Sequence, residues 1–227
     1  MIAIISDVHG NYPALKSVLN KIDEIGCDSI ISLGDVAGYY CMVNECIDEF
    51  RRRKVVNILG NHDSYIIGKG QCPRSATVNN CIDYQKKILT KENYSYLESS
   101  LQFLDNSCIS ARHGGWNDPL DEYINEFDFS ISKKYLCKFF CSGHTHIQKI
   151  QQCGDITYFN PGSVGQPRDG NPKASFALIC NNSVNLIRVE YPVDEIFERM
   201  QQEGFEDRIS ECLYKGTKVE SYVTKIS

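Results

Sequence analysis

Three short apolar runs near the N-terminus each lead into a turn that carries side chains able to bind a metal ion. The runs cover residues 2–5, 29–33 and 54–59, and amphipathic helical patterns lie between them. The turns carry, in chain order, Asp7 and His9, then Asp35, then Asn61, His62 and Asp63. This alternation indicates βαβ units in an α/β fold, in which the carboxyl ends of parallel strands meet at one edge and bind ligands. We therefore expect the three turns to converge.

The remaining segments are typical of a single domain over residues 1–227. Asn11 is suited to cap the first helix, which ends near Gly26. Residues 75–103 are helical in character and predict a cap segment, which would help to select the substrate if it lay over the site. Five further segments predict strands and a last one predicts a helix: SCISAR, YLCKFFC, ITYF, ASFALIC, SVNLIRVEY and VDEIFERMQQEG.

All five histidines of the chain lie at strand-to-loop junctions, close to Gly, Asp or Asn. Besides His9 and His62, these are His113, His144 and His146. A single histidine of this kind is ordinarily a surface or core residue, but five in this placement favour a metal site. Imidazole, carboxylate and amide ligands suit borderline divalent metals such as Mn, Fe, Zn, Co and Ni.

The number of candidate ligands predicts two ions rather than one. The candidates are Asp7, His9, Asp35, Asn61, His113, His144 and His146. Pairs of ions about 3.5–4 Å apart are a known solution for phosphate chemistry, and one carboxylate then bridges them.

The motifs DVHGN, GDVAGY, GNHD, HGG and GHTH occur in this order, and the series resembles the calcineurin-like metallophosphoesterase superfamily. NPGSVGQPRDG at 160–170 and the closing VEYPVDEIFERM…LYKG resemble its YfcE-type branch of small bacterial phosphodiesterases. The resemblance covers essentially the whole chain. It implies a four-layer αββα sandwich of two mixed sheets flanked by helices.

The resemblance also implies a role for each ligand. The family pattern assigns one ion to Asp7, His9 and His146, and a second ion to Asn61, His113 and His144, with Asp35 bridging. His62 would face the substrate, as a general acid for the leaving oxygen or as a donor to the phosphoryl group. Asp63 either orients His62 or stabilises the turn.

Two residues are candidates for direct contact with the phosphate. Arg168 presents a guanidinium fork that matches phosphate oxygens, although an arginine in a Pro/Gly loop is also an ordinary surface residue. Asn11 either touches phosphate or only caps its helix. Aromatic residues after the motifs either stack on a substrate base or pack the loops, namely Tyr39, Tyr40, Trp116 and Tyr123.

The expected function is that of a dinuclear-metal phosphoesterase, in which a metal-bridging hydroxide attacks phosphorus. Branch resemblance favours phosphodiesters, and manganese is the first candidate metal, with Fe, Zn, Ni and Co as alternatives. A phosphomonoesterase, or a phosphatase for dinucleoside polyphosphates or phosphoproteins, is the alternative on the same fold. A non-catalytic protein-binding scaffold is a third reading, which loss of ligands would favour, and here every ligand position is filled.

The composition of the chain limits the kinds of partner that it is expected to bind. The formal net charge of −5 argues against sequence-independent binding to nucleic acid, so a small phosphorylated substrate, with a nucleotide as one candidate, is expected. No apolar run approaches the length of a membrane span, and the N-terminus lacks a signal-peptide pattern. The eleven cysteines are therefore predicted to be reduced thiols of a cytoplasmic protein.

Arg112 precedes the predicted ligand His113, and its charge is unusual there unless the side chain points away or pairs with a carboxylate.

Overall fold

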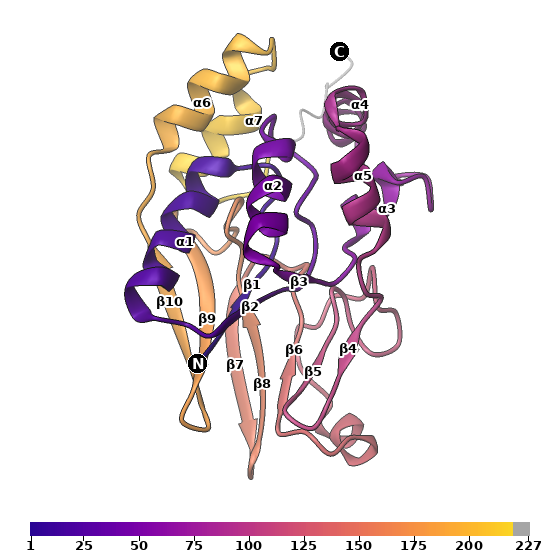
Figure 1. Ribbon diagram of the computed structural model, residues 1–227, viewed down its shortest axis with the longest axis vertical. Helices are drawn as coiled ribbons and strands as arrows, with labels where there is room; N and C mark the ends of the chain where they lie inside the picture. The colour runs from indigo at the N-terminus through magenta and orange to yellow at the C-terminus, as the bar shows by residue number, and fades with distance from the viewer. Residues whose placement is uncertain (220–227) are drawn as a thin grey trace, which may run out of the picture.

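Two five-stranded β-sheets lie face to face in the computed structural model, which describes residues 1–219 (Figure 1). The strands of the first sheet, in spatial order, are β10 (Ser183–Val189), β9 (Ala174–Cys180), β1 (Ile2–Ile5), β2 (Ser29–Ser32) and β3 (Val56–Asn57). Those of the second sheet are β4 (Leu104–Asp105), β5 (Ile109–Ala111), β6 (Phe139–Cys141), β8 (Ile156–Pro161) and β7 (Gln148–Cys153).

Both sheets are mixed, with a parallel centre and antiparallel strands toward the edges. In the first sheet β1 pairs in parallel with β2, and β2 with β3, whereas β9 and β10 are antiparallel additions. In the second sheet β5, β6 and β8 are parallel, and β4 and β7 are antiparallel. The predicted α/β class with two mixed sheets is confirmed.

Alternation of side chains along the strands divides the core into layers. In β1, Ala3 and Ile5 pack toward the helices, while Ile4 packs into the apolar layer between the two sheets. In β6, Phe139 lies in the layer between the sheets and Phe140 packs on the outer face of the second sheet. Central strands such as β1 and β6 are buried on both faces, which is why they read as continuous apolar runs.

The helices that cover the first sheet are α1 (Tyr12–Ile25), α2 (Val43–Arg53), α6 (Val193–Gln202) and the short α7 (Arg208–Glu211) (Figure 1). As expected, α1 begins at Asn11, whose Oδ1 accepts a hydrogen bond from the Ala14 N–H at 3.2 Å. It ends at Gly26 in the left-handed conformation, at φ 76°. The outer face of the second sheet is covered by the segment 114–135, which contains the 3₁₀ helix η1 (Phe129–Lys134).

The segment 75–103 is helical, as predicted, and forms α4 (Ala76–Ile88) and α5 (Lys91–Glu98). Helix α5 packs on α2, where Arg51 donates to Asn93 Oδ1 at 3.1 Å, and α4 packs on α3 (Asn61–Ile66). These two helices extend the helical layer beside the first sheet (Figure 1).

Two strands differ from the expectation. The apolar run 54–59 pairs as a strand only at Val56–Asn57, because the chain turns directly into α3. Strand β7 was not expected, since its sequence, QKIQQC, is mostly polar; it is an edge strand with exposed residues, and so needs no apolar pattern. Across residues 1–219 the structure contains no helix long and apolar enough to cross a membrane.

Candidate metal centre

The carboxyl ends of strands from both sheets deliver the predicted ligands to one place. Asp7 and His9 follow β1, Asp35 follows β2, and Asn61 opens α3. From the second sheet, His113 follows β5, and the loop after β6 supplies His144 and His146. All seven side chains are brought together in the interior, and none of the seven residues is more than 4% exposed.

Five of these seven residues have a left-handed backbone, which is unusual for residues other than glycine. The φ angles lie between 54° and 64° for Asp7, His9, Asp35, His144 and His146. Each such residue costs on the order of 1 kcal/mol and persists only where the surrounding structure holds it. Strain concentrated in this way marks a functional site rather than an ordinary set of turns.

Two glycines of the motifs leave room for the ligands. A Cβ at Gly60 would collide with the carboxylate of Asp35, and a Cβ at Gly38 would collide with the ring of His9. Glycine is thus required at these positions of the GNHD and GDVAG turns, because the neighbouring Asp35 or His9 side chain leaves no room for a Cβ.

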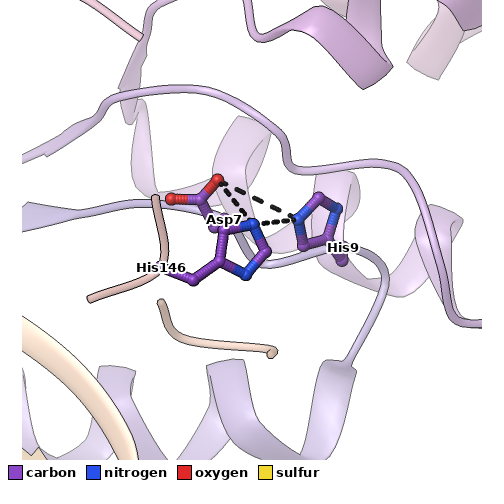
Figure 2. Close-up of side chains that lie close together, drawn as sticks. All are labelled: Asp7, His9 and His146. Atoms are coloured by element: carbon purple, nitrogen blue, oxygen red, sulfur yellow. Dashed lines mark hydrogen bonds and ion pairs between the residues drawn. The ribbon is translucent and has the colours of Figure 1, made fainter. Parts of the chain in front are cut away.

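The first cluster consists of Asp7, His9 and His146 (Figure 2). His146 Nε2 lies 3.3 Å from Asp7 Oδ1 and 3.1 Å from His9 Nε2. The Nδ1 atoms of both rings face backbone carbonyls: that of His9 donates to Ala37 O at 2.9 Å and that of His146 to Gln166 O at 2.6 Å. In a neutral imidazole with Nδ1 protonated, Nε2 carries only a lone pair, so each ring points an acceptor at the other.

The second cluster consists of Asp35, His113 and His144. His113 donates from Nδ1 to Leu33 O at 2.8 Å, and its Nε2 lies 2.9 Å from Asn61 Oδ1. The Nε2 atom of His144 is buried and has no hydrogen-bond partner. Asp35 joins the two clusters, because its Oδ2 lies 3.8 Å from His9 Nε2 and 3.5 Å from His113 Nε2.

The buried acceptors of this site fit a cation. Asp7 Oδ1 and Asp35 Oδ2, like His144 Nε2, have no hydrogen-bond partner although they are inaccessible to solvent. Unpartnered buried acceptors are costly, and a metal ion is the partner that suits carboxylates and imidazoles together. Two nitrogens that each lie about 2.1 Å from a shared ion are about 3 Å apart, which matches the approach of His9 to His146.

Burial changes the pKa values of the ionisable side chains at the site. It raises the pKa of Asp7 from 3.8 to about 7, with the charge of Asp35 adding to the effect, and raises the pKa of Asp35 well above its usual value. Burial also lowers the pKa values of His9 and His146 well below 6.5, and that of His144 to about 2. The imidazoles are therefore neutral and able to donate lone pairs to a metal near neutral pH.

His62 lies beside the clusters without belonging to the assigned ligand set. Its ring centroid is 4.9 Å from that of His9 and 5.1 Å from that of Tyr39. Its Nδ1 has no partner, and its backbone N–H donates to Asp35 Oδ1 at 2.8 Å. Of the two roles weighed for Asp63, the structure shows the turn-stabilising one, since its carboxylate accepts from the backbone N–H groups of Asp35, Ala37 and Gly60.

A cavity of about 50 Å³ opens onto the clusters. Its lining consists of Asp35, Tyr39, Asn61, His62, Arg74, Tyr123, His144, His146 and Arg168. Arg168 is thus at the cavity, as expected of a phosphate contact, and it donates to Tyr39 OH at 3.2 Å. Arg74 was missed by the sequence reasoning, because a Pro-Arg-Ser sequence ahead of a helix carries no signal beyond a helix start.

Other predicted residues serve the scaffold. Asn11 is fully buried; it caps α1 and donates to Gly165 O at 2.9 Å, so we assign it no direct substrate contact. Arg112 points away from the clusters and pairs with Asp105 at 2.9 Å, which resolves the unusual charge. Trp116 packs against Phe127 in the layer outside the second sheet.

The helices of the segment 75–103 contact the loop that follows Asp35. None of the residues that line the cavity belongs to this segment. Its nearest link is Gln85 of α4, which accepts a hydrogen bond from the Gly38 N–H at 2.8 Å and donates to Tyr40 O. The segment therefore positions the loop under His9 rather than covering the cavity.

The chain is similar in sequence to known proteins and to the model of one protein family. The model of the calcineurin-like phosphoesterase superfamily domain matches residues 1–183. The uncharacterized protein MJ0912 of Methanocaldococcus jannaschii is 30% identical over 244 residues, covering 95% of this chain and 98% of that protein. Phosphodiesterase YfcE of Escherichia coli K12 is 29% identical over 193 residues, covering 80% of this chain and 88% of the relative.

Two solved structures share the fold along nearly the whole chain. A metallophosphoesterase from Sphaerobacter thermophilus has a TM-score of 0.83 at 29% identity, covering 95% of this chain and 99% of its own. The hypothetical protein PH1004 from Pyrococcus horikoshii OT3 has a TM-score of 0.86 at 22% identity, covering 96% and 100%.

Proposed function

Because the chain belongs to the calcineurin-like phosphoesterase superfamily and is a metal-dependent phosphoesterase, we propose that it hydrolyses phosphodiesters at a two-metal centre. The observation that carries the proposal is the position of Asp35, whose Oδ2 lies within 3.8 Å of an imidazole Nε2 from each cluster. A carboxylate placed in this way suits the bridging role. The preference for diesters is supported by the similarity to phosphodiesterase YfcE.

Each ion would have its own ligands. Asp7, His9 and His146 would hold one ion, and Asn61, His113 and His144 the other, with Asp35 shared. When bound, two divalent cations neutralise phosphoryl oxygens and lower the pKa of a coordinated water toward neutrality. Manganese is the first metal to test, with Fe, Zn, Ni and Co as alternatives, because all of them accept this mixed donor set.

The remaining side chains bind and orient the phosphoryl group. Arg168 would bind its oxygens from the side of the first cluster, held in place by Tyr39 and Gln166. His62 is kept neutral by burial, which lowers its pKa well below 6.5, so it can donate a hydrogen bond to the phosphoryl group or the leaving oxygen. Rigid placement of these groups supplies the alignment that in-line attack requires.

The lining of the cavity indicates how a substrate would lie. The cavity is bordered by Tyr123, which is 44% exposed, whereas Tyr39 is buried on its inner side. The substituents of a diester would extend past Tyr123, whose ring suits a nucleotide base, and we propose a small phosphorylated substrate of that kind.

The state of the thiols supports a reducing compartment. All eleven cysteines are described by the structure and all are free; six are buried. Burial raises the pKa of Cys46 and Cys141 well above 9, so these behave as small apolar groups. We propose the cytoplasm on this ground.

Turnover of bis-p-nitrophenyl phosphate beside p-nitrophenyl phosphate, after chelation and re-addition of Mn²⁺, tests the proposal. Metal-dependent cleavage of the diester that is lost in His62→Ala is expected. Preferential cleavage of the monoester would instead favour the phosphomonoesterase alternative. Tight metal binding with no cleavage of either compound would favour a binding role.

A further inference from the structure

Two arginines line the cavity, and each lies beside a different metal cluster. Arg168 lies beside the first cluster, since its backbone N–H donates to His146 O at 3.2 Å. Its guanidinium is held by Gln166 Oε1 and Tyr39 OH, so its position is set by neighbours that carry no charge.

Arg74 lies on the side of the second cluster. Its Nη2 donates to Asp121 Oδ1 at 2.7 Å, and the same carboxylate oxygen lies 3.8 Å from Nε2 of His144. The two guanidinium groups therefore flank the cavity.

The contacts of Arg74 are replaceable, unlike those of Arg168. Its side chain is 33% exposed and that of its partner Asp121 is 40% exposed, so their ion pair is partly solvated and weak. Tyr123 is 44% exposed, and its ring centroid lies 4.2 Å from that of His144, next to the same ion pair. A ligand anion can compete with Asp121 for the guanidinium, because phosphate accepts from the fork in two parallel hydrogen bonds.

We propose that Arg74 is a second anion subsite, which binds a further phosphate joined to the one at the metal clusters. The inference rests on the proposed function and specifies its substrate: a phosphodiester of a nucleotide that carries a further phosphate linked to the reacting one. With one phosphoryl group at the metal clusters, the next phosphate along the chain meets Arg74, which lines the cavity and is 33% exposed. Asp121 holds Arg74 at the cavity in the absence of substrate and gives it up when the second phosphate binds.

Calorimetric titration of AMP and ADP into the Mn²⁺-loaded protein tests the subsite, with Mn²⁺ kept in excess over nucleotide. The two probes share the nucleoside and differ only in the second phosphate. We expect ADP to bind the native chain about tenfold more tightly than AMP, as one charge-assisted contact at a partly exposed site implies. In Arg74→Gln this ratio falls to about 1, and Arg74→Lys retains part of it because the charge stays while the fork is lost.

Two further variants sharpen the test. Asp121→Asn frees Arg74 and raises the ratio of ADP to AMP affinity. Arg52→Gln removes the same charge from an exposed arginine that does not line the cavity, and keeps the native ratio. Circular dichroism and metal content confirm that each variant is folded and loaded.

The outcomes separate the subsite from the proposed function. If bis-p-nitrophenyl phosphate is cleaved but ADP binds no better than AMP, or the ratio survives in Arg74→Gln, the subsite is refuted and the phosphodiesterase stands. If no phosphoester is cleaved but the ratio depends on Arg74, the subsite stands and the proposed function fails.

Discussion

The Nε2 atoms of His9 and His146 face each other (Figure 2) and lie 3.1 Å apart. The Nδ1 atom of each ring is engaged by a backbone carbonyl. Because burial keeps both rings neutral, neither can donate a hydrogen bond across this gap. Two facing lone pairs repel each other unless a cation lies between them. The carbonyls of Ala37 and Gln166 thus select the tautomer that makes this pair a metal ligand set.

Replacing the shared carboxylate should impair both clusters. Asp35→Asn keeps the shape but removes the charge that lies between His9 and His113. We expect loss of at least one bound metal equivalent and a fall in kcat/KM of more than about 100-fold, because outer-shell changes alone cost 10–100-fold. Elemental analysis and turnover of bis-p-nitrophenyl phosphate measure both; full retained activity contradicts the bridging assignment.

Removing the imidazole of His62 should leave the metals in place. His62→Ala takes away a side chain that lies in the cavity but outside the assigned ligand set, so metal content is expected to match the native protein. The turnover number should fall by about 10²–10⁴-fold, the usual contribution of a positioned acid or donor. Loss of bound metal in this variant would instead make His62 a ligand, which its proximity to His9 and Asp35 permits.

The charge of Asp7 should have opposite effects on stability with and without metal. In the metal-free protein its pKa is raised from 3.8 to about 7, so the folded state holds this proton more tightly than the unfolded state. The free energy of unfolding of the metal-free protein therefore falls as pH rises from about 4 to 7. Above pH 7 the ionised carboxylate of Asp7 destabilises the folded state by on the order of 4 kcal/mol.

Asp7→Asn should accordingly be more stable than the native chain in EDTA at pH 8, and less stable than it with saturating Mn²⁺. Urea unfolding at pH 5 and pH 8, with and without metal, gives the comparison. At pH 5 the metal-free difference should shrink, because the native carboxyl is then protonated. A variant that is destabilised in EDTA at pH 8 would show that the charge of Asp7 is compensated within the protein itself.

Glycine at position 60 should be required for metal binding rather than for the turn. Its φ of −90° is one that alanine adopts freely, but a Cβ there would collide with both the carboxylate and the backbone nitrogen of Asp35. Gly60→Ala is expected to lower metal affinity at least about tenfold, as displaced ligand geometry does. Gly70→Ala is the matched control, since its Cβ would meet only Tyr65 at 3.8 Å. Equal metal affinity in the two variants would contradict the steric argument.

Much of the site was predictable from local patterns. Short apolar runs followed by ligand-bearing turns predicted βαβ units, and the known geometry of parallel strands predicted that Asp7, Asp35 and Asn61 would converge. The cap at Asn11 and the end of α1 at Gly26 were likewise readable, because both depend on backbone groups only a few residues away.

What the sequence alone determined is therefore the set of candidate ligands and the fold class, since both follow from residue types and their order along the chain. Tertiary structure decided the tautomers of His9 and His146, the approach of Asp35 to two clusters, and the place of Arg74 at the cavity. It also placed residues 75–103 behind the site. The physical reason is that these features depend on contacts between segments far apart in the chain, where packing, not local propensity, sets the geometry.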